Sequence, residues 1–163
     1  MKRYLLPLAA ALLAISPVAF GDGKACDLTS PDEIQATLGV KPNLKASALP
    51  NGVEVCTGKA GGSTVTIRLY PRKDDAEQEK EEAKLDALRK AGALIETRRV
   101  GKINCLEIRP GGKAARQAYT TSCTTPSTSK APMHAVVEVS NPSQSLEMRQ
   151  LAPLADSIAG RLY

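Results

Sequence analysis

The chain has 163 residues, of which 42% are hydrophobic and 24% charged, and its net charge is +5 at neutral pH. Phe, Trp and Tyr together make up only 3% of the residues. Proteins that hold single-stranded nucleic acid stack its bases on aromatic side chains. We therefore expect no nucleic-acid partner, despite the basic charge balance.

Residues 1–21 have the three parts of a cleavable secretory signal peptide. Lys2 and Arg3 form a basic start, and an apolar run of about eleven residues follows. The small residues of Ala19-Phe20-Gly21 favour cleavage after Gly21. The run is too short to cross a bilayer as a helix, which makes an uncleaved membrane anchor the weaker alternative. The sequence thus predicts a periplasmic or secreted protein, and loss of Lys2 and Arg3 would lower its net charge by two.

The position of Cys26 soon after this apolar run raises the alternative of a lipoprotein. Processing of a lipoprotein needs small, apolar residues directly before the cysteine, whereas Asp22 and Lys24 place two charges there. We therefore expect Cys26 to be a structural thiol and the mature chain to carry no lipid anchor and no transmembrane segment.

The mature chain is expected to begin with a short helix and a hairpin. Ser30-Pro31-Asp32-Glu33 is typical of a capped helix start, and Gly39 is a typical stop. Residues 41–51 contain two prolines and are expected to form a loop. Residues 53–57 and 65–69 alternate between apolar and polar side chains, which predicts two half-buried strands.

A long charged helix is expected over residues 74–91, because acidic residues fill its first turns and basic residues its last. Its narrow apolar stripe and charged opposite side indicate a solvated outer face. Four further strands follow, at residues 94–100, 103–109, 118–124 and 133–139. The last of them is the most apolar and is expected at the centre of the sheet. A helix over residues 145–162, which Pro153 should kink or restart, ends the chain.

This order of elements predicts an α+β fold. We expect one domain over residues 22–163, with helices covering one face of an antiparallel sheet of five to six strands.

Four cysteines in an exported chain predict two disulfides, for which three connectivities are possible. Cys105 and Cys123 flank a turn-like segment at residues 111–113, and a hairpin there would place them opposite each other. Cys26 would then pair with Cys56. The chain has no C-x-x-C pattern and a single histidine, so we expect no metal site and no cofactor.

The N-terminal part of the mature chain resembles a family of small exported bacterial domains of unknown function, common among actinobacterial lipoproteins. The resemblance rests on Cys26-Asp27-Leu28-Thr29, Glu33, Leu38-Gly39 and Cys56, and it covers about thirty residues. It implies an α+β fold and a disulfide between Cys26 and Cys56. It carries no catalytic residue, and this chain departs from the family at the lipidation signal.

No residue pattern specifies catalysis. His134 is the only histidine and could act as a general base with a serine or a carboxylate, although no nucleophile-elbow pattern accompanies it. Glu77, Glu81 and Glu82 lie near one another on the charged helix, whereas glycosidase carboxylates flank a cleft from opposite sides. We therefore expect no catalytic residue.

One basic segment suggests a docking surface. Six cations lie within residues 98–116, namely Arg98, Arg99, Lys102, Arg109, Lys113 and Arg116. They are either an unevenly charged soluble surface or a docking site for a protein or an acidic envelope component. The leading hypothesis is a non-catalytic exported binding module, of the type that inhibits an envelope enzyme or neutralises a toxin. The alternatives are a hydrolase that uses His134 and a carrier that holds a small apolar ligand or lipid between the sheet and the long helix.

Overall fold

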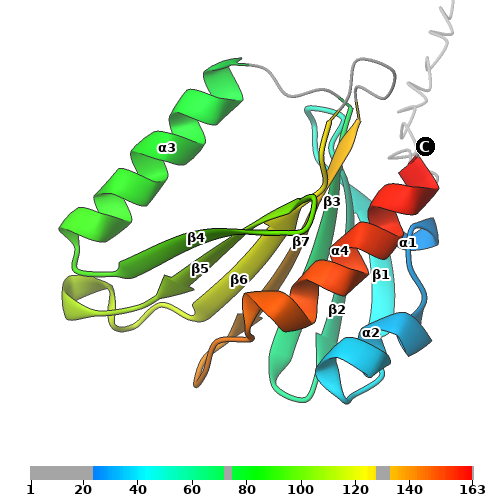
Figure 1. Cartoon of the computed structure of the whole chain (residues 1–163), viewed down its shortest axis with the longest axis horizontal. Helices are drawn as coiled ribbons and strands as arrows, with labels where there is room; N and C mark the ends of the chain where they lie inside the picture. The colour runs from blue at the N-terminus through cyan, green and yellow to red at the C-terminus, as the bar shows by residue number, and fades with distance from the viewer. Residues whose placement is uncertain (1–23, 72–74, 128–132, 163) are drawn as a thin grey trace, which may run out of the picture.

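The computed structural model describes residues 24–71, 75–127 and 133–162, and for residues 75–78 it describes the backbone only. The signal peptide predicted for residues 1–21 lies outside this part of the chain. A seven-stranded antiparallel sheet has the order β1-β2-β3-β7-β6-β5-β4 (Figure 1). Its strands are β1 Asn43–Ala48, β2 Glu54–Ala60, β3 Ser63–Tyr70, β4 Leu94–Val100, β5 Ile103–Arg109, β6 Tyr119–Thr124 and β7 His134–Asn141. The helices are α1 Lys24–Asp27, α2 Pro31–Leu38, α3 Asp75–Lys90, the 3₁₀ turn η1 Gly112–Ala114 and α4 Met148–Leu162.

The predicted α+β class is confirmed, and β7 is the central strand as expected. The sheet has one strand more than predicted, because residues 43–48 of the expected loop form β1 at one edge. Leu44, Ala46 and Ala48 alternate with polar residues along β1, but the strand is almost entirely exposed, so the pairing of its backbone with β2 holds it in place. Gly58 lets β1 approach closely, because an added Cβ would lie 3.0 Å from Pro42 Cβ and 3.2 Å from the Asn43 carbonyl oxygen.

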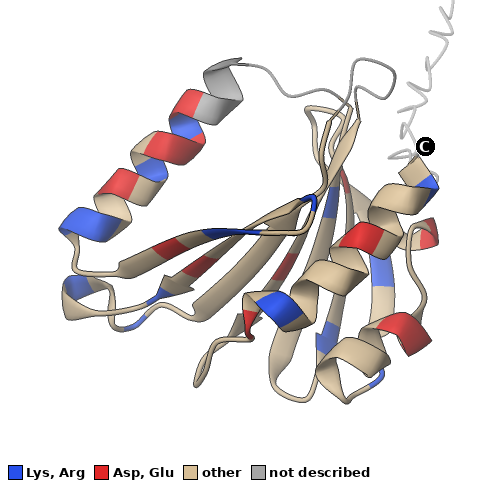
Figure 2. Ribbon diagram, viewed as in Figure 1, with Lys and Arg blue, Asp and Glu red and all other residues tan. Residues whose placement is uncertain are grey.

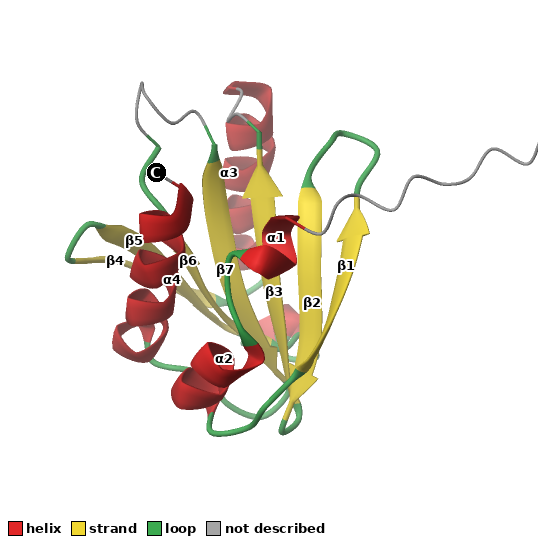
Figure 3. Cartoon of the chain, turned by 90° about the vertical axis from the view of Figure 1, so that its right-hand side faces the viewer, coloured by secondary structure: helices red, strands yellow, loops and turns green. Residues whose placement is uncertain are grey.

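The helices cover both faces of the sheet, and the expectation that they cover only one is wrong. Helices α1, α2 and α4 lie on one face, whereas α3 lies on the other side of the strands (Figure 3). Strand alternation explains how both faces are used. In β3, Val65 and Ile67 enter the core on the face covered by α1, α2 and α4, while Arg68 and Tyr70 point to the opposite face and line the space next to α3. We call this opposite side the second face of the sheet.

The core lies between α4 and the sheet. α4 packs across β5, β6 and β7 through an apolar stripe that includes Leu151, Ala155 and Ile158, all fully buried. The helix does not restart at Pro153, which is exposed within a continuous helix. The apolar stripe of α4 therefore stays in one piece, and one hydrophobic cluster joins all three helices of this face to the strands.

Both predicted disulfides are present. The Cys26–Cys56 bond ties α1 to β2, and the Cys105–Cys123 bond joins two residues that face each other on β5 and β6. Within the described residues no cysteine is free. Because disulfides form and persist in oxidising surroundings, this pattern indicates an oxidising compartment outside the cytoplasm.

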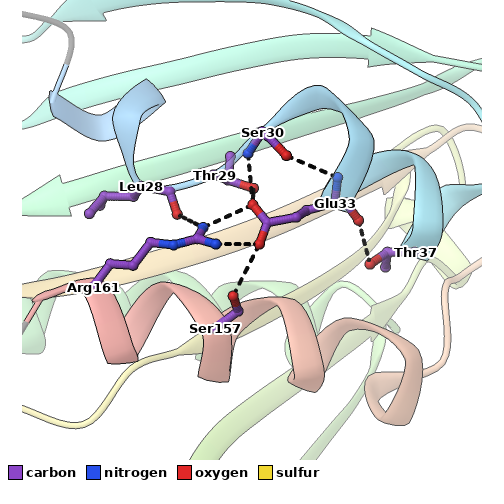
Figure 4. A network of polar contacts seen from close by, with 7 residues as sticks. All are labelled: Leu28, Thr29, Ser30, Glu33, Thr37, Ser157 and Arg161. Carbon is purple, nitrogen blue, oxygen red and sulfur yellow. Dashed lines mark hydrogen bonds and ion pairs between the residues drawn. The ribbon is translucent and has the colours of Figure 1, made fainter.

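A polar network connects the short helix α2 to α4 (Figure 4). Ser30 caps α2 by accepting a hydrogen bond from the Glu33 amide, and the Ser30 amide donates to the Glu33 carboxylate at 2.9 Å. Arg161 of α4 donates to both oxygens of that carboxylate, and Ser157 adds a hydrogen bond at 3.2 Å. The Arg161 guanidinium is the main reason that the pKa of Glu33 falls to about 2.

Candidate functional site

A groove with a volume of about 450 Å³ lies between α3 and the second face of the sheet. It is lined by Glu81, Lys84, Leu85 and Leu88 of α3 and by side chains of β3, β5, β6 and β7, namely Arg68, Tyr70, Leu106, Ile108, Thr120, Ser122, Thr124, His134, Val136 and Glu138. The helix bridges the strands, so the groove has a roof and a floor. We call this space the α3 groove.

One flank of the α3 groove is apolar. Leu85 and Leu88 are the half-buried side chains on the inner side of α3, whose other described residues are exposed and mostly charged (Figure 2). Opposite them, Leu106 and Ile108 of β5 alternate with side chains that point to the core. Because these four side chains are only partly buried, apolar surface remains exposed inside the groove.

The other flank carries hydroxyl groups. Thr120, Ser122 and Thr124 are the residues of β6 that point to the second face, and the strand register places Ser122 beside Leu106 and Thr120 beside Ile108. A row of hydroxyls therefore runs directly alongside the apolar flank. Such a floor offers hydrogen-bond donors and acceptors to a molecule whose other side is apolar.

A bidentate ion pair lies in the floor. Arg68 of β3 and Glu138 of β7 approach with Nη1–Oε2 and Nη2–Oε1 distances of 3.0 and 3.5 Å, and both side chains are more than two-thirds buried. Burial alone would lower the pKa of Arg68, but the hydrogen bond and the charge of Glu138 raise it on balance. Glu81 and Lys84 on the roof add one charge of each sign. The α3 groove therefore holds two acidic and two basic side chains and has no net charge.

His134 lies at the end of the α3 groove beside Tyr70, its partner across the β3–β7 register. The two rings stack with centroids 4.9 Å apart and an interplanar angle of 7°. His134 is only 5% exposed. This stacked geometry gives the histidine a packing role and leaves little of the imidazole open to the groove.

The far end of α3 is fixed by glycines. Gly92 follows the helix with φ of +94°, and its carbonyl group packs directly against Gly111, where an added Cβ would lie 2.5 Å from the Gly92 oxygen. The Lys113 amide donates to the Ala91 carbonyl at 2.8 Å. The connection between β5 and β6 therefore anchors the C-terminal end of α3, and with it the roof of the groove.

The chain has no match among protein-family models, curated proteins or solved structures. Within the described residues no group of three or more His, Cys, Asp or Glu side chains is placed to hold a metal ion. In the same part of the chain no helix is long and apolar enough to cross a membrane.

The six cations of the predicted docking surface are distributed over both faces of the sheet and both ends of the β4–β5 hairpin. Lys102 lies in the turn between β4 and β5, whereas Lys113 and Arg116 lie beyond the opposite end of β5. Arg98 and Arg99 are neighbours on β4 and therefore point to opposite faces of the sheet. The structure thus does not gather the six side chains into one patch.

Arg109, the remaining cation of this set, is engaged by two acidic residues. Its Nε donates to Glu107 at 2.6 Å, and its Nη2 lies 3.5 Å from Glu96. The hydrogen bond from Arg109 lowers the pKa of Glu107. This effect outweighs that of burial, which by itself would raise the pKa of a residue that is only 5% exposed. The pairing of β4 with β5 places Glu96 opposite Glu107 and so brings both acidic residues to Arg109.

The sequence predicts this space only through the alternative of a carrier that holds a ligand between the sheet and the long helix. Its lining residues were not identified, because a polar strand position is normally solvated. The alternation of Thr66, Arg68 and Tyr70 along β3 was the available signal, since it assigns these side chains to one face.

Proposed function

We propose that the chain is an exported, non-catalytic binding module that holds a small amphipathic molecule in the α3 groove. The observation that carries this proposal is the groove itself, a space of about 450 Å³ lined by leucines and isoleucine on one flank and hydroxyls on the other. Sites for small molecules are typically about 300–1,000 Å³, mostly apolar and equipped with a few placed polar groups.

The charges of the groove restrict the chemistry of the ligand. Arg68 and Glu138 neutralise each other at hydrogen-bond distance, and Glu81 and Lys84 balance each other on the roof. Bringing a net charge into this partly desolvated space would cost free energy without a matching counter-charge. The ligand we propose is therefore uncharged overall, with an apolar body along Leu85 and Leu106 and hydroxyl or amide groups along β6.

The groove supports this proposal better than the two other hypotheses. A docking surface for an inhibited enzyme would need the cations to act together, whereas Lys102 lies at one end of β5 and Lys113 and Arg116 lie beyond the other. A hydrolase would need an accessible imidazole, and His134 is 5% exposed and stacked on Tyr70. Export through a signal peptide cleaved near Gly21 is part of the proposal, and the two disulfides support it.

Binding of 1-monolauroylglycerol below its critical micelle concentration, followed by isothermal titration calorimetry, tests the proposal. We expect wild-type protein to bind it more tightly than dodecanoate, which has the same chain and one negative charge. Ser122→Trp should abolish binding because the indole would fill the floor of the groove.

Thr57→Trp is the matched control. Thr57 lies on β2, opposite Thr66 and therefore on the same second face, but it does not line the groove. It should bind the probe as wild type does. Equal binding by Ser122→Trp, or no binding by wild type, would refute the groove as the binding site.

A further inference from the structure

Strand β4 ends the sheet with an open edge. It pairs with β5 on one side, and among the described strands none pairs with its other side. Its side chains are mostly exposed, and Leu94 at its start is 69% exposed. Figures 1 and 3 show the strand at the outer limit of the sheet. Such an edge presents unpaired backbone groups that can accept another strand.

The hairpin turn determines which backbone groups face outward. Gly101 has φ of +60° and is the first residue of a two-residue turn flanked by the pair Val100 and Ile103, which is the arrangement of a type II′ turn. The residues that flank such a turn bond to each other. Every second residue back from Val100 therefore bonds to β5, and residues 95, 97 and 99 direct their N–H and C=O groups to the open edge.

The sequence of β4 is complementary to itself in one antiparallel register. Outward-facing residues of one strand must pair with outward-facing residues of the other, so the register centres on a residue, and the three registers with the greatest overlap centre on residues 96, 97 and 98. Centring on Glu96 would oppose two glutamates, and centring on Arg98 would oppose two arginines. Centring on Thr97 places Glu96 of each copy opposite Arg98 of the other, and like-charged pairs are avoided.

We propose that the β4 edge is an interface with a second copy of this chain, in which two β4 strands pair antiparallel about Thr97 and join two sheets into one. Figure 2 shows an acidic position in β4 followed by basic positions further along the strand. The same register places Leu94 opposite Val100 on the face that carries Glu96 and Arg98. A two-fold axis through Thr97 makes each of these contacts twice.

The charges also give the interface its specificity. Glu96 lies 4.0 Å from Arg98 and 3.5 Å from Arg109 of the same chain, and all three side chains are about half exposed. Exposed ion pairs of this kind contribute little to the stability of a fold. The reversal of Glu96 or Arg98 should therefore leave the monomer folded and change only the pairing between copies.

Sedimentation velocity over a concentration series at low ionic strength, with circular dichroism to verify folding, tests the interface. Wild type should show a reversible monomer–dimer equilibrium that weakens as salt is added. Glu96→Arg and Arg98→Glu should each weaken dimerisation at least tenfold, because each opposes like charges twice. The double variant Glu96→Arg/Arg98→Glu should dimerise as wild type does, because it restores both pairs.

Mixing the two single variants provides a second, independent readout. One variant then carries arginine at both positions and the other glutamate at both, so an equimolar mixture should form heterodimers although neither variant dimerises alone. Lys45→Glu on β1, the strand at the opposite edge, should have no effect. A monomeric wild type at about 1 mM, single variants that dimerise normally, or a mixture that remains monomeric would overturn the proposal. None of these outcomes bears on ligand binding in the α3 groove.

Discussion

Arg161 of α4 and Glu33 of α2 form a bidentate ion pair, although they are 128 residues apart in the sequence. The same guanidinium donates to the Leu28 carbonyl at 2.6 Å, just before α2 begins. One side chain near the C-terminus thus holds both the start of α2 and the segment before it (Figure 4).

This ion pair makes stability depend on pH in acid. The pKa of Glu33 falls from 4.5 to about 2 on folding, so its contribution is complete above pH 4.5 and is lost as the pH falls towards 2. Glu33→Gln should lower the free energy of unfolding by about 1–2 kcal/mol at neutral pH, a figure reduced for partial solvent exposure. Urea unfolding at several pH values should show the difference from wild type shrinking between pH 4.5 and 2.

Asp32→Asn is the control for that experiment. Asp32 is adjacent in the sequence and also forms an ion pair, with Lys41 at 2.6 Å, but its side chain is 73% exposed. It should change the stability by less than about 0.5 kcal/mol. Equal losses in both variants would show that charge at the start of α2, rather than the contact with Arg161, is responsible.

Removal of the disulfides should cost similar amounts of stability. The bonds close chain segments of 30 and 18 residues, for which loop entropy predicts about 3–4 kcal/mol each, slightly more for Cys26–Cys56. Replacement of each pair by alanine, followed by urea unfolding, measures both. A much larger loss for Cys105→Ala/Cys123→Ala would mean that the cross-strand bond acts mainly through the native sheet.

One substitution in the Arg68–Glu138 ion pair changes the net charge of the α3 groove. Glu138→Gln leaves Arg68 with its charge but without an anionic partner, so affinity for dodecanoate should rise about tenfold while affinity for 1-monolauroylglycerol stays the same. Calorimetry with both ligands measures the change. Glu79→Gln on α3 makes the same change in net charge outside the groove lining. An equal rise in that variant would assign the effect to long-range charge.

The contact between Gly92 and Gly111 should determine how firmly the C-terminal end of α3 is held over the groove. Gly111→Ala should cost about 1–3 kcal/mol, because the new Cβ would press on the Gly92 carbonyl. Hydrogen exchange should then accelerate in the last turn of α3. Gly160→Ala in α4, where an added Cβ meets no atom within 4 Å, should instead stabilise by about 0.5–1 kcal/mol. Unchanged exchange in Gly111→Ala would show that α3 is held by other contacts.

The sequence was sufficient for elements with a strong local pattern. The capping box of α2, the alternation in β3 and the apolar stripe of α4 led to correct elements, and the hairpin around residues 111–113 led to the correct disulfides. Strand β1 was not predicted because the alternating residues of this exposed edge are one leucine and two alanines, a weak apolar pattern in a segment between Pro42 and Pro50. The face chosen by α3 was missed because the helix buries only a narrow stripe, which fits either side of a sheet.

The candidate site was harder to predict for a different reason. Arg68 and Glu138 belong to strands 70 residues apart in the sequence, and only the adjacency of β3 and β7 brings them together. Ser122 and Leu106 become neighbours only through the β5–β6 register. Pairings of this kind depend on the order of strands in the sheet, which composition and periodicity do not specify.

The two disulfides link consecutive cysteines, and neither crosses the boundary between β3 and β7. The first pair lies entirely within the half of the chain that ends at β3, and the second within the half that begins at β4. A chain emerging N-terminus first can therefore complete Cys26–Cys56 before Cys105 appears. Oxidation in the order of emergence yields the native bonds directly, without any later exchange of partners.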